Sequence, residues 1–221
     1  EQHLVAGDVC DPDTIEVVEE LAVQVFHLDG QHDQQSHAGG RGASPTVTEA
    51  EFDEALDTVN PNPIYERMGI DYGLMAHGEF GEGEADDDHT EAYAIYTMDA
   101  SSMNAYMRGT QRPTWYREDS DRLSRELAEH IEQAEPTKKD LTVYRGLGRF
   151  SRGMVGARIR DDGFISTTLD RRVAETFGNV VEVRVPAGSK AIAGNWGEFE
   201  VILAPGTEFD VTEEGALDVV Q

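Results

Sequence analysis

The spacing of apolar residues along the first 135 residues predicts a series of helices. Apolar positions three and four apart, opened by a Ser, Thr or Asp cap and closed by Pro or Gly, indicate helices with one buried face. The run over 117–135 is the clearest, because Leu123, Leu127 and Ile131 lie on one stripe and Pro136 follows. Similar patterns predict helices after Asp13 and over 48–60, 90–98 and 99–108.

The period of the pattern changes to two at Lys138. Short alternating or β-branched runs follow, most of them separated by Pro or Gly, which is typical of strands. Helices first and strands afterwards favour an α+β fold. The predicted strands span 141–145, 163–168, 180–185, 190–193 and 199–203, with weaker candidates at 211–212 and 219–220.

A glycine-rich polar stretch over 29–42 separates the first predicted helix from the others. It is nearly free of apolar side chains, as linkers are. We therefore expect an N-terminal segment with a flexible Gly- and His-rich linker over 1–45, followed by one folded domain over 46–221.

Three histidines, His27, His32 and His37, recur at every fifth position in and before this linker. Histidine is a common metal ligand, so a metal site is one interpretation. The spacing suits neither a helix face nor a usual zinc pattern, and a solvated linker is the favoured interpretation. No metal is expected.

Charge narrows the range of partners. The 221 residues include 44 acidic and 18 basic side chains, for a net charge of −26. Nucleic acids and anionic membranes attract clustered Lys and Arg, so neither is expected as a partner. No run approaches ~18 apolar residues, and no secretory signal begins the given sequence, so no membrane span or export signal is expected. A single cysteine, Cys10, cannot form an internal disulfide.

Three short elements in the strand-rich half carry side chains suited to chemistry. Arg145 and Gly146 end a predicted strand, where a guanidinium can hold a phosphate bidentately and a glycine lets a ligand approach the backbone. Three hydroxyls end the predicted strand at 166–168. Glu198 and Glu200 lie two apart at the start of another, so both carboxylates are expected to point into one cleft.

The order and spacing of these elements resemble the Arg…Ser-Thr-Ser…Glu-x-Glu signature of the mono-ADP-ribosyltransferase family, which includes clostridial binary toxins and vertebrate ecto-enzymes. The resemblance extends over about residues 48–211 and includes Tyr96, Asn104 and Arg108. Thr168 stands where the family usually has serine and keeps the hydroxyl. The resemblance implies a helical N-terminal half packed on a split antiparallel β-sheet core.

The resemblance also implies roles in the use of NAD+ as a substrate. Arg145 would hold the phosphates, and the Gly146 backbone would bind the nicotinamide amide. Ser166 would orient Glu200, which would stabilise the charge that develops as nicotinamide leaves. For Phe177, a contact with the nicotinamide and a plain core position both remain open. The residues expected to bind NAD+ are Arg145, Gly146, Ser166, Thr167, Phe177 and Glu200, and the catalytic ones are Arg145, Ser166, Glu198 and Glu200.

Glutamate at the first position of the pair goes with arginine as acceptor in this family. Glu198 would therefore position or deprotonate a protein arginine, and the neighbouring Asn195 and Trp196 would contact the acceptor protein. The expected activity is that of an NAD-dependent protein-arginine ADP-ribosyltransferase. An NAD glycohydrolase, in which water replaces the acceptor, would use the same residues.

The setting is suggested by composition and by one short motif. Of the 18 basic residues only three are lysines, and so acidic a surface is stabilised by screening salt. This resembles haloarchaeal proteins and those of their viruses, although an acidic protein of a high-GC mesophile is an alternative. The segment 32–42 is similar to short tails of phage head-associated proteins. We expect a virus-encoded enzyme located in the virion or host cytoplasm, in contact with virion proteins; the alternative is a minor virion component that keeps the fold without catalysis.

Overall fold

Most of the strand-rich half forms one sheet in the computed structural model, which describes residues 47–58, 60–72, 88–110, 119–147 and 154–220. In this part of the chain the sheet has eight strands in the order β2-β7-β8-β4-β1-β3-β6-β5. All neighbours pair antiparallel except β4 and β8, which are parallel. The strands are β1 (Leu141–Leu147), β2 (Arg158–Asp161), β3 (Ile165–Thr168), β4 (Asn179–Val185), β5 (Ala191–Ala193), β6 (Glu200–Leu203), β7 (Thr207–Glu213) and β8 (Ala216–Val219).

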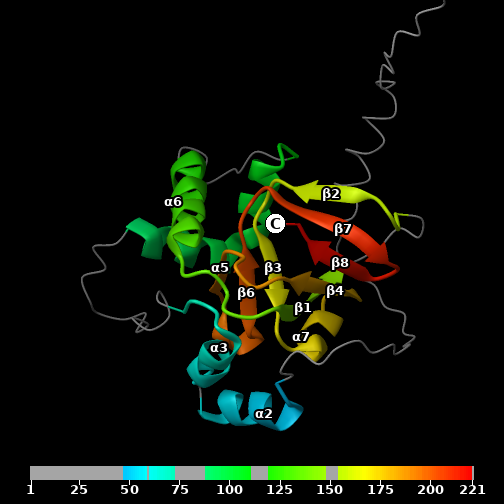
Figure 1. Cartoon of the computed structure of the whole chain (residues 1–221). Coiled ribbons are helices and arrows are strands. Elements are labelled where there is room, and N and C mark those ends of the chain that lie inside the picture. The colour runs from blue at the N-terminus through cyan, green and yellow to red at the C-terminus, as the bar shows by residue number, and fades with distance from the viewer. Residues whose placement is uncertain (1–46, 59, 73–87, 111–118, 148–153, 221) are drawn as a thin grey trace, which may run out of the picture.

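The helices of the described residues precede the sheet in sequence, apart from two short ones between its strands. Figure 1 shows α2 and α3 together below the strands and α6 at the left. The expected α+β architecture is therefore confirmed, with a mainly antiparallel sheet. The helices are α2 (Glu49–Thr58), α3 (Asn62–Met68), α5 (Asp88–Met107), α6 (Ser120–Gln133), α7 (Arg171–Glu175) and the 3₁₀ turn η1 (Trp196–Glu198).

Helix α5 is kinked where the sequence predicts one helix to end and another to begin. Asp99 at the kink has φ −150° and ψ 59°, which no helix accommodates. Its carboxylate accepts a hydrogen bond from the backbone N–H of Ser102 over 3.1 Å. Asp99 thus acts as the predicted N-cap of the second segment.

The sequence prediction missed helix α3 and strand β2. Pro61 ends the preceding helical pattern, but proline is also tolerated in the first turn of a helix, and α3 begins directly after it with Pro63 in that turn. Strand β2 lacks an apolar run, since only Ile159 and Asp161 are buried in it. The predicted helix after Asp13 and the linker lie outside the described residues.

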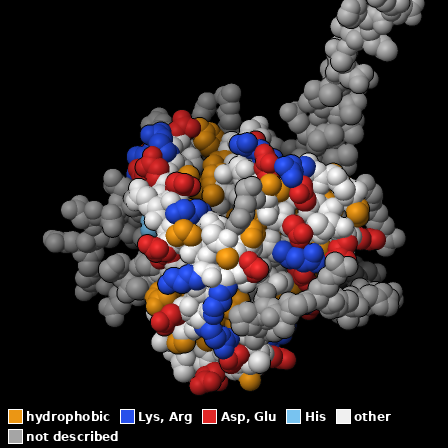
Figure 2. Space-filling model, in the orientation of Figure 1, with side chains coloured by type: hydrophobic (Ala, Val, Ile, Leu, Met, Phe, Trp, Pro, Cys, Tyr) orange, Lys and Arg blue, Asp and Glu red, His pale blue; other side chains and the backbone are white. Residues whose placement is uncertain are grey.

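One apolar core joins the helices to the sheet. The predicted stripe of α6 is buried, including Leu127 and Ile131, and burying such a side chain contributes roughly 1.5–3 kcal/mol. Surface charges are intermixed on the face seen in Figure 2, where Lys and Arg lie among Asp and Glu. Arg184, for example, contacts Glu182, Glu213 and Asp218. No helix of the described residues is both long and apolar enough to cross a membrane.

Candidate active site

The three strands that carry the sequence elements are neighbours in the sheet. Strand β3 lies between β1 and β6. Thr168 pairs with Tyr144 on one side and with Glu200 on the other. Arg145, next to Tyr144, and Glu200 therefore lie on strands that flank β3, so the topology brings together elements that are 55 residues apart in the chain.

The Glu200 carboxylate is buried, with only 7% of the residue exposed. The backbone N–H of Asn195 donates to its Oε2 over 2.8 Å. Burial raises the pKa of Glu200, and the nearby negative charge of Glu198 raises it further. Hydrogen bonds from Asn195 and Ser166 and the positive charge of Arg145 oppose that rise in pKa. The carboxylate is thus fixed in place and poorly hydrated.

Ser166 is held in turn by a tyrosine of α5. The hydroxyls of Tyr96 and Ser166 lie 2.7 Å apart, and Tyr96 is fully buried. Burial raises the pKa of Tyr96 to about 12, so its hydroxyl stays neutral. Its ring packs edge-on against Phe164, with 5.2 Å between ring centroids. A chain of side-chain contacts thus runs from α5 through Ser166 to Glu200.

Glu198 does not share a strand with Glu200, and the expectation that it does was wrong. Strand β6 begins at Glu200, while Glu198 ends the turn η1. Phe199 between them has φ 47°, a left-handed conformation that breaks the alternation of a strand. Glu198 is half-buried and still lies close enough to raise the pKa of Glu200. A turn, rather than the alternation of a strand, therefore brings the two carboxylates near each other.

Side chains from two other elements hold this turn by its backbone. The hydroxyl of Thr168, at the end of β3, donates to the Glu198 carbonyl oxygen over 2.6 Å. The hydroxyl of Tyr65 on α3 donates to the Glu200 carbonyl oxygen over 3.0 Å. Thr168 stands where the family usually has serine. It thus supports the turn with a hydroxyl, which serine and threonine have in common.

Gly194 belongs to the loop expected to contact the acceptor, but its contact with Glu200 was not predicted from the sequence. A Cβ at this position would lie 2.2 Å from Oε2 of Glu200, so only glycine leaves space for the carboxylate where it now lies. The following residue, Asn195, is exposed, and its side chain caps η1 by accepting from the N–H of Gly197. Trp196 is half-buried. The roles predicted for Asn195 and Trp196 in acceptor recognition stay predictions.

A buried ion pair lies near Arg145. Arg108, directly after α5, donates two hydrogen bonds of 2.7 Å to Asp161, and their side chains are 9% and 1% exposed. Asp161 also accepts from the backbone N–H of Gly163 over 2.9 Å. Burial lowers the pKa of Arg145, while the charge of Asp161 opposes this. In the sequence, only the family resemblance pointed to Arg108, and no pattern pointed to Asp161.

Gly146 and Phe177 contact each other at the end of α7. A Cβ on Gly146 would lie 2.3 Å from the carbonyl oxygen of Ala174 and 2.6 Å from Cβ of Phe177. Glycine therefore lets this end of α7 pack on β1, a reason that differs from the ligand approach we expected. Phe177 is 55% exposed, so its interpretation as a core residue was wrong, and its contact with NAD stays a prediction.

Thr167 faces the opposite side of β3 from Ser166 and Thr168, because successive strand residues alternate. It is buried, and its hydroxyl donates to the carbonyl oxygen of Val201 over 2.7 Å. Its hydroxyl thus links β3 to β6, and the predicted contact with NAD stays a prediction.

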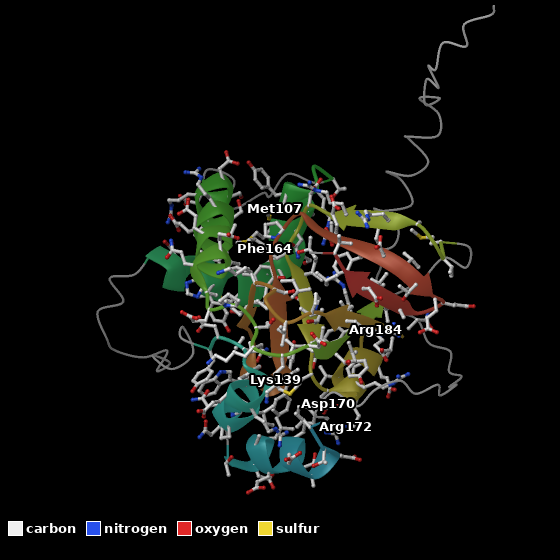
Figure 3. All side chains as sticks on the ribbon, viewed as in Figure 1. Met107, Lys139, Phe164, Asp170, Arg172 and Arg184 are labelled. Atoms are coloured by element: carbon white, nitrogen blue, oxygen red, sulfur yellow. The ribbon has the colours of Figure 1, made fainter. Side chains whose placement is uncertain are left out.

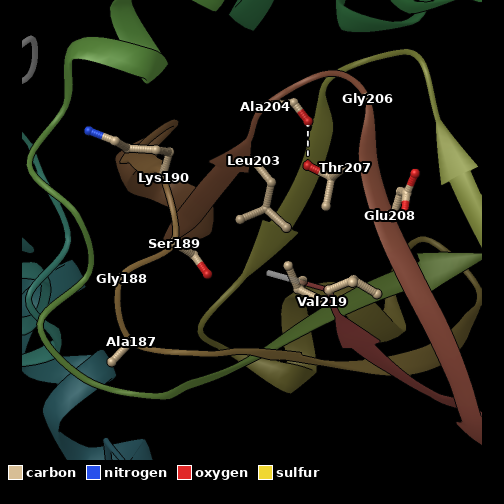
Figure 4. Close-up of a pocket in the computed structure, with 11 residues that line it drawn as sticks. Ala187, Gly188, Ser189, Lys190, Leu203, Ala204, Gly206, Thr207, Glu208 and Val219 are labelled. Atoms are coloured by element: carbon tan, nitrogen blue, oxygen red, sulfur yellow. Dashed lines mark hydrogen bonds between the residues drawn. The ribbon is translucent and has the colours of Figure 1, made fainter.

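A cavity of about 630 Å³ lies elsewhere, at the far end of β6 from Glu200 (Figure 4). Leu203 and Val219 line it together with the turn that contains Gly188 and Ser189. None of the predicted site residues lines this cavity. Among the described residues, no group of three or more His, Cys, Asp or Glu side chains is arranged to hold a metal ion.

Comparison with known proteins identifies the family of the chain. A family model described as ADP-ribosyltransferase exoenzyme matches residues 83–218, which is more than half of the chain. The chain belongs to this family. As an ADP-ribosyltransferase it is an NAD-dependent transferase. No curated protein sequence matches it.

Solved structures of ADP-ribosyltransferases have the same fold. Vis, a toxin from Vibrio splendidus whose structure with agmatine is known, superposes with a TM-score of 0.54 at 16% identity. The match covers 80% of this chain and 88% of Vis. Plx2a, a toxin from Paenibacillus larvae, has a TM-score of 0.52 at 15% identity, over 76% of this chain and 96% of its own. At these identities the likeness extends to the fold alone.

Proposed function

We propose that this ADP-ribosyltransferase moves ADP-ribose from NAD to arginine side chains of proteins. The observation that carries the proposal is the half-buried Glu198 beside the buried Glu200, whose pKa Glu198 helps to raise. A buried carboxylate suits the reacting sugar, while a more accessible one suits an incoming acceptor. The two therefore divide the reaction between donor and acceptor.

Arg145, Gly146 and Ser166 would serve the donor side. The Arg145 guanidinium can bind two phosphate oxygens at once. The Gly146 backbone, next to it on β1, would bind the nicotinamide amide, with the exposed ring of Phe177 beside it. Ser166, which hydrogen-bonds Glu200, would keep that carboxylate aimed at the ribose.

The reaction breaks the bond between the ribose C1 and the nicotinamide nitrogen, and nicotinamide leaves with the electron pair. Positive charge then develops on the ribose ring, as in glycoside hydrolysis, and the fixed Glu200 carboxylate stabilises it. A guanidinium nitrogen of the acceptor forms the new bond to C1. The proton that this nitrogen loses passes to Glu198.

Arginine as acceptor follows from the chemistry of the pair. A guanidinium stays protonated in water, so its attack on a carbon needs a carboxylate close by. Glu198 provides that carboxylate and attracts the cation before it reacts. Agmatine, the molecule in the Vis structure, also carries a guanidinium, which supports the same acceptor chemistry here.

The test uses labelled NAD with polyarginine and, as a matched control, polylysine. Label is expected on polyarginine alone and is expected to disappear in Glu200→Gln. Release of nicotinamide without label on either polymer would make the protein an NAD glycohydrolase instead. If no NAD is consumed, the alternative of a structural virion protein without catalysis is favoured.

We also propose that the protein is encoded by a virus and adapted to high salt. This proposal rests on the net charge of −26 and on the short segment 32–42, which lies outside the described residues. Because the Debye length falls from ~10 Å at 0.1 M salt to ~3 Å at 1 M, the melting temperature of a salt-adapted chain is expected to rise with salt. An unchanged melting temperature would contradict the adaptation to salt.

A further inference from the structure

The residue between the two glutamates is in an unusual conformation. Phe199 is the one non-glycine residue of the described chain with a positive φ, at 47°. Phenylalanine does not adopt this conformation by preference, because its Cβ crowds the backbone. Such a conformation persists where the surroundings impose it. The relative placement of Glu198 and Glu200 depends on it.

The ring of Phe199 is held by an N-terminal helix. Phe199 is fully buried and meets Phe52 of α2 edge-on, with 4.5 Å between ring centroids and 73° between ring planes. Phe52 is itself buried. Next to this contact, Tyr65 of α3 donates its hydroxyl to the Glu200 carbonyl oxygen. Helices α2 and α3 therefore contact the turn at the Phe199 ring and at the Glu200 carbonyl oxygen.

Helix α2 is also anchored to the start of α7, which follows β3 in the chain. Arg172 contacts Glu49 and Asp53 of α2 over 2.8 and 3.4 Å. It also contacts Asp170 over 2.6 Å, and Figure 3 shows Asp170 and Arg172 side by side above α2. The backbone N–H of Asp170 donates to the Thr168 hydroxyl, which in turn holds the Glu198 carbonyl oxygen. These contacts connect α2 to the turn by a second route.

We infer that Phe52 is a positioning residue of the transferase, acting through Phe199 on Glu198 and Glu200. The inference rests on the proposed function for the meaning of the two glutamates. Phe52 precedes residue 83, where the match to the family model begins. Its role follows from the ring contact and the burial of both rings, and Tyr65 supports the same turn from α3.

The test compares Phe52→Leu with Phe209→Leu. Phe209 is a fully buried phenylalanine of β7, which four strands of the sheet separate from β6, so the second variant matches the first in chemistry but not in place. Two quantities are measured for each variant: the rate of amide hydrogen exchange in the peptide 195–200, and the kcat and KM of NAD turnover. A misplacement of reacting groups by about 1 Å can cost on the order of 100-fold in rate.

In Phe52→Leu we expect faster exchange at 195–200 and a kcat lower by about 10- to 100-fold. The KM for NAD is expected to change less than kcat, because Arg145 and Gly146, which would hold the phosphates and the nicotinamide amide, lie on β1 and away from the turn. Phe209→Leu is expected to lower the melting temperature without either change. Tyr65→Phe, which removes one hydroxyl and keeps the ring, is expected to act in the same direction as Phe52→Leu and serves if that variant does not fold.

Equal exchange and equal kcat in the two leucine variants would overturn the inference. A wild-type protein that consumes no NAD would instead contradict the proposed function. Exchange over 195–200 would still decide whether Phe52 orders the turn, so the two failures are distinguishable.

Discussion

The hydroxyl of Thr168 donates a hydrogen bond of 2.6 Å to the carbonyl oxygen of Glu198. Thr168 is also the cross-strand partner of Glu200. A single residue at the end of β3 thus contacts the backbone of one glutamate and pairs with the other. We therefore expect the turn to require a hydroxyl at this position, from either serine or threonine.

Replacing Thr168 tests this requirement. Thr168→Val keeps the shape and removes the hydroxyl, which leaves the Glu198 carbonyl oxygen and the N–H of Asp170 without this partner. We expect a loss of about 1 kcal/mol in the free energy of unfolding and a larger relative loss in transfer to arginine. Thr168→Ser is expected to retain both, as measured by urea denaturation and labelled-NAD transfer. Equal activity in the valine variant would show that the turn holds without the hydroxyl.

Gly194→Ala is expected to separate activity from stability. The backbone of Gly194 is not in the left-handed region, so alanine is tolerated by the chain itself. Its Cβ would overlap Oε2 and Cδ of Glu200, which lie 2.2 and 2.6 Å from that position. The carboxylate must move, and kcat is expected to fall by at least about 10-fold with little change in melting temperature. Gly197→Ala is a matched control, because a Cβ there would meet its nearest atom at 3.5 Å.

The raised pKa of Glu200 gives two opposite dependences on pH. Burial raises this pKa above its ordinary value of 4.5, so the unfolded chain ionises the group first. Ionised Glu200 therefore costs stability, and the cost grows as the pH rises from below 4.5 through the folded pKa. Glu200→Gln is expected to be more stable than the wild type at pH 7, with the difference lost at low pH.

Activity is expected to change in the other direction, because the ionised carboxylate stabilises the positive charge on the ribose. Turnover by the wild type should fall on the acid side at a pH above 4.5. Melting curves and NAD turnover over the same pH range measure the two effects. A variant no more stable than the wild type at pH 7 would contradict the burial cost.

The buried pair of Arg108 and Asp161 predicts a large loss of stability. Asp161→Asn removes the carboxylate to which the Arg108 guanidinium, 9% exposed, donates two hydrogen bonds. Removing one partner of a buried pair costs about 3–5 kcal/mol. The exposed pair of Arg158 and Asp210 is the control, since water screens it and Asp210→Asn is expected to have little effect. Similar denaturation midpoints for the two variants would contradict this assignment.

The strands that carry the candidate site could be predicted, because strands have a strong local signal. The runs at 141–145, 163–168 and 199–203 alternate or are β-branched, and all three form strands within two residues of their predicted starts. Their adjacency in the sheet was not visible in the pattern. It entered through the resemblance to a family, since the pairing of β1, β3 and β6 depends on the whole fold.

The turn at Phe199 could not be predicted. Glu-Phe-Glu has the alternation of a strand, and a left-handed phenylalanine has no local preference that would indicate it. The cause is tertiary, because the ring packs against Phe52, 147 residues earlier in the chain. The contact of Gly194 was missed for a similar reason, since its neighbour Glu200 reaches it only after the chain has turned.

The roles of the two glutamates are tested most directly by label transfer from NAD to polyarginine in Glu198→Gln and Glu200→Gln. We expect Glu200→Gln to lose all release of nicotinamide, because no fixed carboxylate remains beside the ribose. We expect Glu198→Gln still to release nicotinamide to water but no longer to label polyarginine. Transfer to polyarginine at the wild-type rate by either variant would contradict the division of the reaction between the two glutamates.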